Sequence, residues 1–566
     1  MRLAFCAVAL VALACLLVRA DRLGMAGDYL DPFSHIGAQD EALYAHSAIK
    51  MARDGGWSTP MFMGRYGLYK PPLLAVAAGL SARILGVSRL ALRMPVALFA
   101  GLAVGLVFWW AAELRSWQAG ACAAALLVSN HLWHGLASLC LTDGLLTAFY
   151  VAALYCLFAD PWLESHWSLW GFSVSVAASI LTKSVAGLLP LAVLGLYWAL
   201  APPKYRPRFA RVLAAGLLSV ALAAPWFLYQ LTMHGRWFRA EHIGVEILGF
   251  GAGSPPQTSQ ENPLAFYLSR VALLDPVLLA VVAAALPAFA GELRRRSAPA
   301  ILLFLSLALP AAAVMAWQYR SISYLLPMVP STAILAAAYN PLFSGRTAKW
   351  AMAMLAAVFV AKAALPSAPW GLPFRAGTTV AVAPLLSGYC RQARGNELIL
   401  VDTPDDFYAT LLPIPRVRYV LTGTAPSPGK YGLDFPSMGI ILTAPQFADL
   451  PRYLPAFRQQ LREWELDSAE PVGTVVFVSS PEEVALLIAS HPDSDFLLPA
   501  AQALAPGVSR LAQGAPAERL GGCETSAAES ACTTATHDAV AVSPGYTLLL
   551  SHHALPAPAV RWSCEL

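Results

Sequence analysis

A series of long apolar stretches constrains this chain more than any other feature of its sequence. Each is close to the length of about 17 to 25 residues that an α-helix needs to cross the hydrocarbon core of a bilayer. They lie at residues 3–19, 91–113, 119–138, 143–159, 166–182, 184–200, 210–229, 272–290, 299–316, 324–339 and 349–365. Hydrophobic residues make up 57% and charged residues 13% of the 566 positions, whereas soluble domains have about 45–50% apolar and 25% charged residues. We therefore predict a mainly α-helical, polytopic membrane protein with about 11 transmembrane helices, within a range of about 9 to 13.

The first stretch and one shorter stretch need separate interpretations. Residues 3–19 follow Arg2, which is typical of a signal peptide or of a first spanning helix. Because no convincing small-residue cleavage site precedes Asp21, we expect an uncleaved helix. Residues 73–87 are apolar but contain Arg83, so we predict a helix at the membrane interface and not a span.

The basic residues predict the orientation of these spans. With a cytoplasmic N-terminus, the positive-inside rule is met because Lys and Arg gather in the inside loops: Arg115, then Lys204, Arg206, Arg208 and Arg211, then Arg294, Arg295 and Arg296, then Arg346 and Lys349. The inside loop from Asp160 to His166 has neither Lys nor Arg and is the exception. The net charge of +4 is spread out, so there is no basic patch for nucleic acid. We predict a multi-pass protein of the cytoplasmic (inner) membrane.

The same topology gathers the unusual polar residues on the outer face. It places there the loops 21–90 and 230–268, the side chains of Asp143, Lys183 and Arg320, and everything after about residue 370. This grouping is independent of the charges that define the orientation, so it supports that orientation. Residues 1–370 are predicted to form the transmembrane domain.

Residues 376–566 are predicted to form a soluble α/β domain on the outer, periplasmic side. Short apolar runs bounded by Pro, Gly and Asp predict strands, and they alternate with helical segments such as SPEEVALLIASH. The strands are expected at 397–402, 417–423, 438–443 and 473–478, after a Pro- and Gly-rich boundary at 366–377. Cys390, Cys523, Cys532 and Cys564 could form two disulfides in an oxidising compartment.

The first outer loop contains the strongest candidates for chemistry. Asp40 and Glu41 begin a segment with apolar residues at helical spacing, so an N-cap and a first-turn acid are the structural explanation. The functional alternative is a carboxylate that takes a proton from an acceptor hydroxyl as a general base. Lys70, in YKPPLL, either extends its amine to lipid headgroups or binds a phosphate at headgroup depth.

Other polar residues on the predicted outer face also have two interpretations. Asp143 is either a functional near-membrane acid or the cap of a short re-entrant turn. Lys183 is interpreted first as a capping or snorkelling lysine. The loop 230–268 mixes basic and aromatic residues, which suits either an anionic, partly apolar ligand or a solvated amphipathic helix. Arg320, just before a span, could hold a second phosphate contact.

Several motifs together resemble the GT-C membrane glycosyltransferases related to the protein O-mannosyltransferases and the lipid A aminoarabinose transferase. The run DEALYAHSAIKMARDGGWSTPMFMGRYGLYKPPLL is similar to the family's first outer loop, with its acidic pair, its G-x-W-x-x-P element and its K-P-P element. LTDGLLTAF, LTKSVAGLLP, RSISYLLPMVP, and APWFLYQ followed by FRAEHIGVEILGF resemble further family motifs in the same order. The resemblance extends over residues 1–340.

The resemblance implies the transfer of a sugar from a polyprenyl-phosphate donor to an acceptor at the outer membrane face, by one inverting displacement. It implies that Asp40 is the catalytic base and that Lys70 and Arg320 bind the donor phosphate. The substrate-binding residues that it implies are Glu41, Tyr44, Tyr69, Asp143, Glu241, His242 and Tyr324. The implied partners are the polyprenyl-phosphate sugar, a lipid or protein acceptor, and membrane lipids.

The chain departs from the family pattern at two positions. Ser184 follows Lys183 where Gly is common, and Tyr69 precedes Lys70 where the lipid A branch often has Glu. The missing acid weakens the case for a metal near the site and for aminoarabinose as the sugar.

Two questions remain open between named alternatives. Asp40 and Asp143 could share a divalent cation, but we favour Lys70 and Arg320 as the source of positive charge and assign no cofactor. A transporter or flippase of lipid-linked sugars is the alternative function. Such proteins place charges at the bilayer midplane, whereas here the charges cluster at one predicted face, which favours the enzyme.

Overall fold

The structure is a computed structural model of the chain, and it describes most of the first 343 residues. The described residues are 2–22, 36–62, 65–249, 262–318, 320–343, 398–401, 417–422, 441–443, 452, 475–478, 481–499, 503–504, 506–509, 511–513, 537–543 and 546–551. The predicted span 349–365, the boundary 366–377 and the four C-terminal cysteines lie outside these residues.

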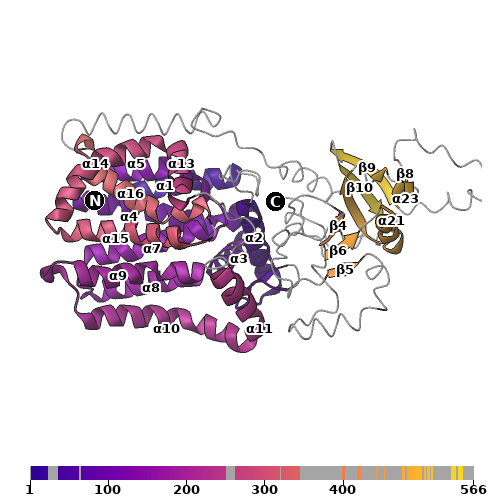
Figure 1. The fold of residues 1–566 in the computed structure, drawn as a ribbon, viewed down its shortest axis with the longest axis horizontal. Coiled ribbons are helices and arrows are strands. Elements are labelled where there is room, and N and C mark those ends of the chain that lie inside the picture. Colours follow the sequence, from indigo (N-terminus) through magenta and orange to yellow (C-terminus); the bar gives the residue numbers. More distant parts are fainter. Residues whose placement is uncertain are drawn as a thin grey trace, which may run out of the picture. The chain divides into compact units, whose positions relative to one another are not determined.

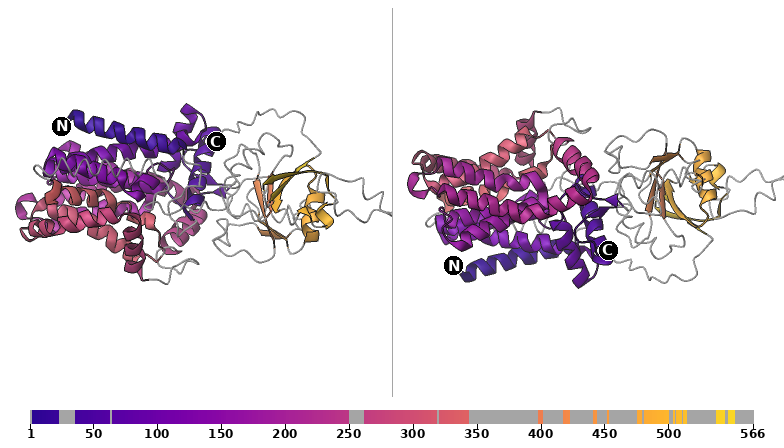
Figure 2. Two further views of the ribbon diagram at one scale, coloured as in Figure 1. Left: turned by 90° about the horizontal axis from the view of Figure 1, so that it is seen from above. Right: turned by 90° about the horizontal axis from the view of Figure 1, so that it is seen from below.

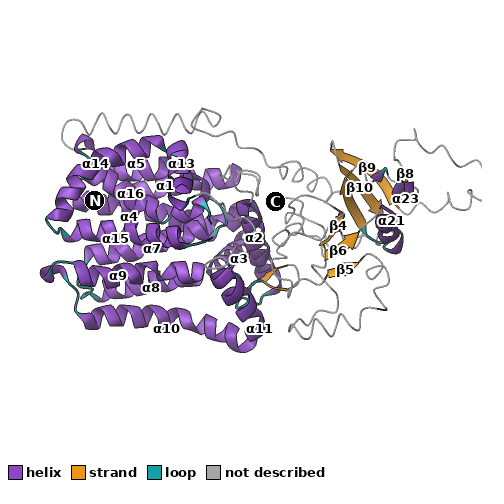
Figure 3. Cartoon of the chain, in the orientation of Figure 1, coloured by secondary structure: helices purple, strands orange, loops and turns teal. Residues whose placement is uncertain are grey.

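The chain divides into two compact units. The first contains the described residues from the N-terminus to residue 343 except Met61–Gly67, and the second contains Met61–Gly67 and the described part of Ala376–Leu566. Figures 1 and 3 show that the first unit is helical, whereas strands dominate the second.

The first unit is built from helices of very different length. They are α1 (Arg2–Arg22), α2 (Ile36–Asp54), α3 (Leu73–Leu85), α4 (Arg89–Leu114), α5 (Trp117–Ser129), α6 (His131–Leu136), α7 (Thr142–Ala159), α8 (His166–Lys183), η1 (Ser184–Leu188), α9 (Leu189–Leu200), η2 (Pro203–Tyr205), α10 (Phe209–Met233), α11 (Gly235–Phe238), η3 (Arg239–Gly249), α13 (Pro263–Leu274), α14 (Pro276–Arg294), α15 (Ala298–Ala316), η4 (Ile322–Leu325), α16 (Met328–Ala338) and η5 (Pro341–Phe343). The η elements are 3₁₀ helices, except that η3 is a π-helix.

Helix α4 is the centre of the first unit, since it packs against α1, α3, α5, α7 and α16. Small residues explain the close approach of α1, which Figure 2 shows along one edge of the bundle. A Cβ atom at Gly105 would lie 2.7 Å from the Phe5 ring, and one at Gly101 would lie 3.0 Å from Cβ of Leu13. Glycine therefore allows α1 and α4 to pack backbone against side chain, as small residues do between membrane helices.

Among the described residues, six helical segments are long and apolar enough to cross a membrane. They are Leu90–Leu114, Thr142–Ala159, His166–Leu200, Phe209–Met233, Pro276–Arg294 and Ala298–Ala316, and five shorter apolar helices accompany them. The first unit is thus that of a multi-pass membrane protein, whereas the count of about 11 spans stays a prediction. Residues 73–87, predicted as an interfacial helix, form the short helix α3.

One of these six segments turns back on itself. Trp162 Nε1 donates a hydrogen bond of 2.9 Å to the carbonyl of Lys204, so the two ends of the segment 166–200 lie together. The chain reverses at η1, where a Cβ atom at Gly187 would lie 2.3 Å from the backbone nitrogen of Ile180. Lys183 therefore sits at the tip of this reversal, at the end of the bundle opposite to Lys204.

The second unit contains two sheets. Strands β1 (Met61–Phe62) and β2 (Arg65–Tyr66) pair antiparallel. The larger sheet has eight strands in the order β5-β6-β4-β3-β7-β10-β9-β8, namely β3 (Leu398–Val401), β4 (Val417–Thr422), β5 (Ile441–Thr443), β6 (Val475–Val478), β7 (Asp495–Pro499), β8 (Ala512–Gln513), β9 (His537–Ser543) and β10 (Tyr546–Ser551). Its pairs are parallel except that β10 runs antiparallel to β7 and β9.

Two described helices accompany this sheet, α21 (Pro481–Ser490) and α23 (Pro506–Ser509). Strands β3 to β6 fall within the four apolar runs predicted as strands, and α21 falls within the predicted helical segment SPEEVALLIASH. That these residues form a soluble domain outside the membrane stays a prediction.

Candidate functional site

A cavity of about 190 Å³ in the first unit is lined mainly by apolar residues, together with several polar and charged ones. The polar residues that line it are Lys70, Asp143, Lys183, Ser184, Glu246 and Tyr324. Its apolar walls come from α7, η1, α9, η3, α15 and the segment before α16, through Leu146, Val185, Ala186, Leu189, Ile247, Pro310, Ala313, Val314, Trp317 and Pro327. The lining thus combines charged side chains with a largely apolar surface.

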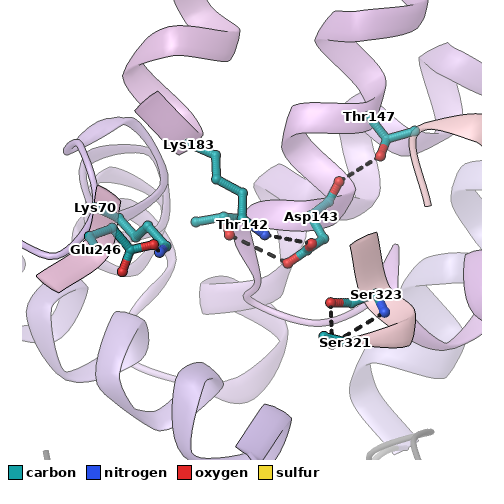
Figure 4. Close-up of polar contacts among 8 residues, drawn as sticks. All are labelled: Lys70, Thr142, Asp143, Thr147, Lys183, Glu246, Ser321 and Ser323. Carbon is teal, nitrogen blue, oxygen red and sulfur yellow. Dashed lines mark hydrogen bonds and ion pairs between the residues drawn. The ribbon is translucent and has the colours of Figure 1, made fainter. Parts of the chain in front are cut away.

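Lys183 contacts two other polar residues of the lining, Asp143 and Tyr324. Its Nζ donates a hydrogen bond of 2.8 Å to Oδ1 of Asp143 (Figure 4) and lies 4.8 Å from the centre of the Tyr324 ring. The Lys183 and Asp143 side chains are 14% and 12% exposed. The interpretation of Lys183 as a capping or snorkelling lysine is therefore wrong, because its amine pairs with an acid that lines the cavity.

Asp143 lies in the first turn of α7, where its side chain and its backbone carbonyl each contact a threonine. Thr142 Oγ1 lies 3.5 Å from Oδ2 of Asp143, and Thr147 Oγ1 donates to its backbone carbonyl at 2.7 Å. The side chain faces Lys183, as Figure 4 shows. The re-entrant cap is thus not the whole explanation, because the carboxylate also pairs with a lysine from another helix.

Lys70 enters the cavity from the segment between β2 and α3. Its amine forms an ion pair with the carboxylate of Glu246, which extends from η3 (Figure 4). The two side chains are 14% and 21% exposed. Burial and the nearby Lys183 ammonium lower the pKa of Lys70, whereas Asp40 and Asp143 oppose this shift. Lys70 does not extend into solvent, so the headgroup-directed interpretation is not supported by its contacts.

Asp40 belongs to α2 and is electrostatically coupled to the same groups. Because α2 begins at Ile36, Asp40 lies inside the helix and the N-cap interpretation is wrong. Burial raises the pKa of Asp40 to about 6, while Lys70 and Lys183 act to lower it and Asp143 adds to the rise. A carboxyl group with this pKa can hold or release a proton near neutral pH.

Tyr44 lies one helical turn after Asp40 and is buried. Its phenol interacts with the Thr142 hydroxyl and with the charges of Asp40 and Asp143, and burial raises its pKa well above the usual value. Tyr44 therefore stays neutral next to the carboxylates of α2 and α7.

Glu41, in contrast, is buried against Arg93 and holds α2 to the bundle. Its two oxygens accept hydrogen bonds of 2.7 Å from Nε and Nη2 of Arg93, and Oε1 also accepts from the backbone nitrogen of Cys140 at 2.8 Å. Glu41 is 1% and Arg93 0% exposed. These contacts indicate a structural role that fixes Asp40, the preceding residue of the helix.

Glu241 and His242, from η3, both contact Leu68, which lies shortly before Lys70. Glu241 Oε2 accepts a hydrogen bond of 2.7 Å from the Leu68 nitrogen, and His242 Nδ1 lies 3.0 Å from the Leu68 oxygen. The His242 ring also interacts with the backbone of Tyr69. Figure 1 shows the neighbouring α11 beside the end of α10. The pair therefore binds the protein's own backbone.

Ser184 follows Lys183 and has unusual backbone geometry. Its φ angle is 45°, a value at which a side chain costs roughly 1–3 kcal/mol of strain. Its hydroxyl lies 2.8 Å from Nε2 of His242. Glycine adopts such a φ angle freely, so the hydroxyl contact is what the serine adds at this position.

Arg320 is not among the residues that line the cavity. Its guanidinium and that of Arg270 both interact electrostatically with the Tyr267 phenol of α13. Asp40 and Tyr44 do not line the cavity either, but both interact electrostatically with Asp143, which does.

Among the described residues, no group of three or more His, Cys, Asp or Glu side chains is arranged to hold a metal ion. The two acids considered for a shared cation, Asp40 and Asp143, already have Lys70 and Lys183 as neighbours.

Sequence reasoning missed three residues or gave them no role in the site. Arg93 lies in a predicted apolar span, although a buried arginine requires an anionic partner. The sequence pattern places Lys183 only at a helix end and Glu246 only in a loop. The sequence does contain a signal for Lys183 and Glu246, because Asp143 and Lys70 each need a partner of opposite charge in a largely apolar environment.

Parts of the chain are similar in sequence to known proteins. The sequence model of the dolichyl-phosphate-mannose-protein mannosyltransferase family matches residues 69–229. An uncharacterised protein of Aquifex aeolicus is 26% identical over 237 residues, which are 42% of this chain and 46% of that protein. The undecaprenyl phosphate-alpha-4-amino-4-deoxy-L-arabinose arabinosyl transferase of Aeromonas hydrophila is 26% identical over 327 residues, 55% of this chain and 57% of that protein. The chain thus matches about half the length of these curated relatives.

The fold is similar to that of a solved enzyme. The crystal structure of ArnT from Cupriavidus metallidurans bound to undecaprenyl phosphate has a TM-score of 0.62 and 15% identity, and the match covers 98% of this chain and 99% of that chain. The apo structure of that protein matches with a TM-score of 0.63. The family match, the relatives and the fold agree with the motifs: over part of its length the chain is similar to protein mannosyltransferases and to an arabinosyl transferase, and its fold is similar to that of ArnT.

Proposed function

We propose that this protein is an inverting glycosyltransferase that moves a sugar from a polyprenyl-phosphate donor to an acceptor at the outer face of the cytoplasmic membrane. The acceptor is lipid A, another envelope glycan or a protein. The observation that carries the proposal is the cavity lined by Lys70, Lys183 and Asp143 and otherwise mainly by apolar residues. The outer-face location rests on the distribution of Lys and Arg between the loops.

The donor fits this cavity by its chemistry. The donor is a phosphodiester with one negative charge attached to a long apolar chain, and the lining of the cavity contains two lysines together with Leu146, Leu189 and Val314. The solved relative from Cupriavidus metallidurans contains undecaprenyl phosphate, which supports a carrier of the same class here. The ion pair of Lys70 with Glu246 would open to admit the phosphate.

The reaction is a single displacement at the anomeric carbon. Asp40 accepts the proton of the acceptor hydroxyl. At the same time the oxygen of this hydroxyl forms a bond to the anomeric carbon, and the bond between that carbon and the phosphate oxygen breaks. Polyprenyl phosphate leaves with the bonding electrons, and Lys70 stabilises its charge. Lys183 orients Asp143 and Tyr324, which we assign to binding of the sugar or acceptor.

The remaining predicted residues have supporting roles in this proposal. Glu41 fixes α2 through Arg93, and the neutral phenol of Tyr44 lies near both acids. Arg320 stays a proposed second contact to the phosphate that moves to the donor on binding. We favour the two lysines over a divalent cation, because the ammonium group of Lys183 already contacts Asp143.

Transfer and transport are distinguished in proteoliposomes loaded with a polyprenyl-phosphate sugar and candidate acceptors. A transferase yields glycosylated acceptor and free polyprenyl phosphate in equal amounts, with the configuration at the anomeric carbon inverted in the NMR spectrum. A flippase changes the leaflet of the intact donor without consuming it, and that result would overturn the proposal.

A further inference from the structure

The ring of His242 connects two segments that each present a lysine to the cavity. On one side Nδ1 contacts the carbonyl oxygen of Leu68 at 3.0 Å, two residues before Lys70. On the other side Nε2 contacts the hydroxyl of Ser184 at 2.8 Å, directly after Lys183. His242 is 1% exposed, so water does not compete for either contact.

The chemistry of these partners fixes the tautomer. A carbonyl oxygen can only accept a hydrogen bond, so Nδ1 carries the hydrogen and donates it to Leu68. In the neutral ring Nε2 is then an acceptor, and the Ser184 hydroxyl donates to it. Burial lowers the pKa of His242 to about 4, which keeps the ring neutral at physiological pH.

A second hydrogen bond holds the same peptide segment. Glu241 accepts from the N–H of Leu68 at 2.7 Å, so both polar backbone groups of Leu68 bond to η3. The wider turn of a π-helix places these side chains on one local surface with Glu246, the ion-pair partner of Lys70. Neighbouring aromatic rings restrict the imidazole further, since Phe238 stacks on it at 4.9 Å between ring centres.

We propose that His242 is a positioning residue that sets the separation of Lys70 and Lys183 by bridging Leu68 and Ser184. The inference rests on the proposed function, because the separation matters only if a lipid phosphate binds at Lys70. The backbone of Ser184 supports it independently. The residue has a φ angle that favours glycine, and only its hydroxyl offers the bond to His242.

The test measures equilibrium binding of undecaprenyl phosphate to the purified full-length protein in detergent. His242→Ala is expected to weaken binding by about tenfold, since displaced binding groups commonly cost about 10- to 100-fold. His242→Asn keeps an N–H near the position of Nδ1 and should lose less. Ser184→Ala should weaken binding, and the double variant His242→Ala with Ser184→Ala should bind no worse than His242→Ala alone. Ser219→Ala is the control, because this buried hydroxyl bonds only within α10 at 2.7 Å.

A comparison in the Lys70→Ala background separates positioning from general support of the fold. If His242 acts through Lys70, His242→Ala causes no further loss of affinity in that background. Equal binding by wild type and His242→Ala, or a full additional loss when Lys70 is absent, would overturn the inference. If His242→Ala does not fold, His242→Asn and Ser184→Ala decide the question. Wild-type binding without sugar transfer defeats the proposed function alone, whereas no wild-type binding defeats both.

Discussion

At the residue scale, the pairing of Lys70 with Glu246 makes the first prediction. The Glu246 carboxylate neutralises the amine that we assign to the donor phosphate, and two negative groups beside one lysine repel each other. Glu246→Gln should therefore tighten binding of undecaprenyl phosphate by about tenfold, or about 1.4 kcal/mol. The measurement is equilibrium binding in detergent at fixed salt, with the exposed Glu164→Gln as control. Unchanged or weaker binding would show that Glu246 does not compete with phosphate.

The pKa of Asp40 makes a second prediction. A general base must be deprotonated in the free enzyme, and burial raises the pKa of Asp40 to about 6. Activity should thus be retained above this pH and fall tenfold per unit below it, instead of persisting towards pH 4. The profile of kcat/KM against pH measures this. An acidic limb near pH 4 would mean that another group, or an unperturbed carboxylate, is the base.

The buried ion pair of Glu41 and Arg93 makes the third prediction. Removing one partner leaves the other charge buried, which typically costs about 3–5 kcal/mol. Arg93→Ala should lower the unfolding temperature markedly, and the double variant Glu41→Gln with Arg93→Leu should recover part of the loss. The exposed pair of Lys50 and Asp54, 2.5 Å apart, is the matched control, because Lys50→Ala should have almost no effect. Equal stability of Arg93→Ala and wild type would remove the structural role assigned to Glu41.

The candidate residues show what sequence could predict at this scale. Asp40, Lys70 and Asp143 are candidates because acids and amines are rare at membrane faces, and the structure places their charges together. Asp40 and Glu41 are adjacent and both carry a carboxylate. Glu41 pairs with the buried Arg93, however, whereas Asp40 interacts with lysines. Only tertiary contacts distinguish them.

At the scale of elements, the turn η1 makes the fourth prediction. A Cβ atom at Gly187 would lie 2.3 Å from the Ile180 nitrogen, so the reversal after Lys183 has no room for a side chain. Gly187→Ala should displace the turn, lower stability by about 1–3 kcal/mol and reduce sugar transfer. Gly195→Ala is the matched control, because a Cβ atom added at this position of α9 would meet nothing within 4 Å. Equal thermal unfolding of both variants would contradict the account of the turn.

Hydropathy did not predict where some of the helices are interrupted. The predicted span 119–138 is divided into α5 and α6 because Asn130 caps α6, accepting from the Trp133 nitrogen at 2.9 Å. Asp275 then accepts from the Asn130 side chain at 2.9 Å. Hydropathy averages over a window and does not detect a polar cap within it. Hydropathy does not detect the reversal at η1 either, because the reversal depends on the absence of a side chain at Gly187.

For the whole molecule, a mainly helical membrane architecture followed from apolar stretches of bilayer length, and the described residues contain six such segments. The arrangement of the site did not follow from length or composition. Asp40, Lys70, Asp143 and Tyr324 come from four separate segments, and their meeting depends on the packing of α2, α7 and η4 around Lys183. The family motifs indicate these residues, but the contacts among them are visible only in the fold.

The central claim is that Asp40 is the base for sugar transfer from a polyprenyl phosphate. It is tested most directly by single-turnover transfer with purified wild-type, Asp40→Asn and Asp54→Asn proteins. Asp54→Asn changes an exposed acid of the same helix and should leave the rate unchanged. Asp40→Asn should slow transfer by about 10²- to 10⁴-fold while binding of undecaprenyl phosphate persists. Transfer by Asp40→Asn at the wild-type rate would contradict the account.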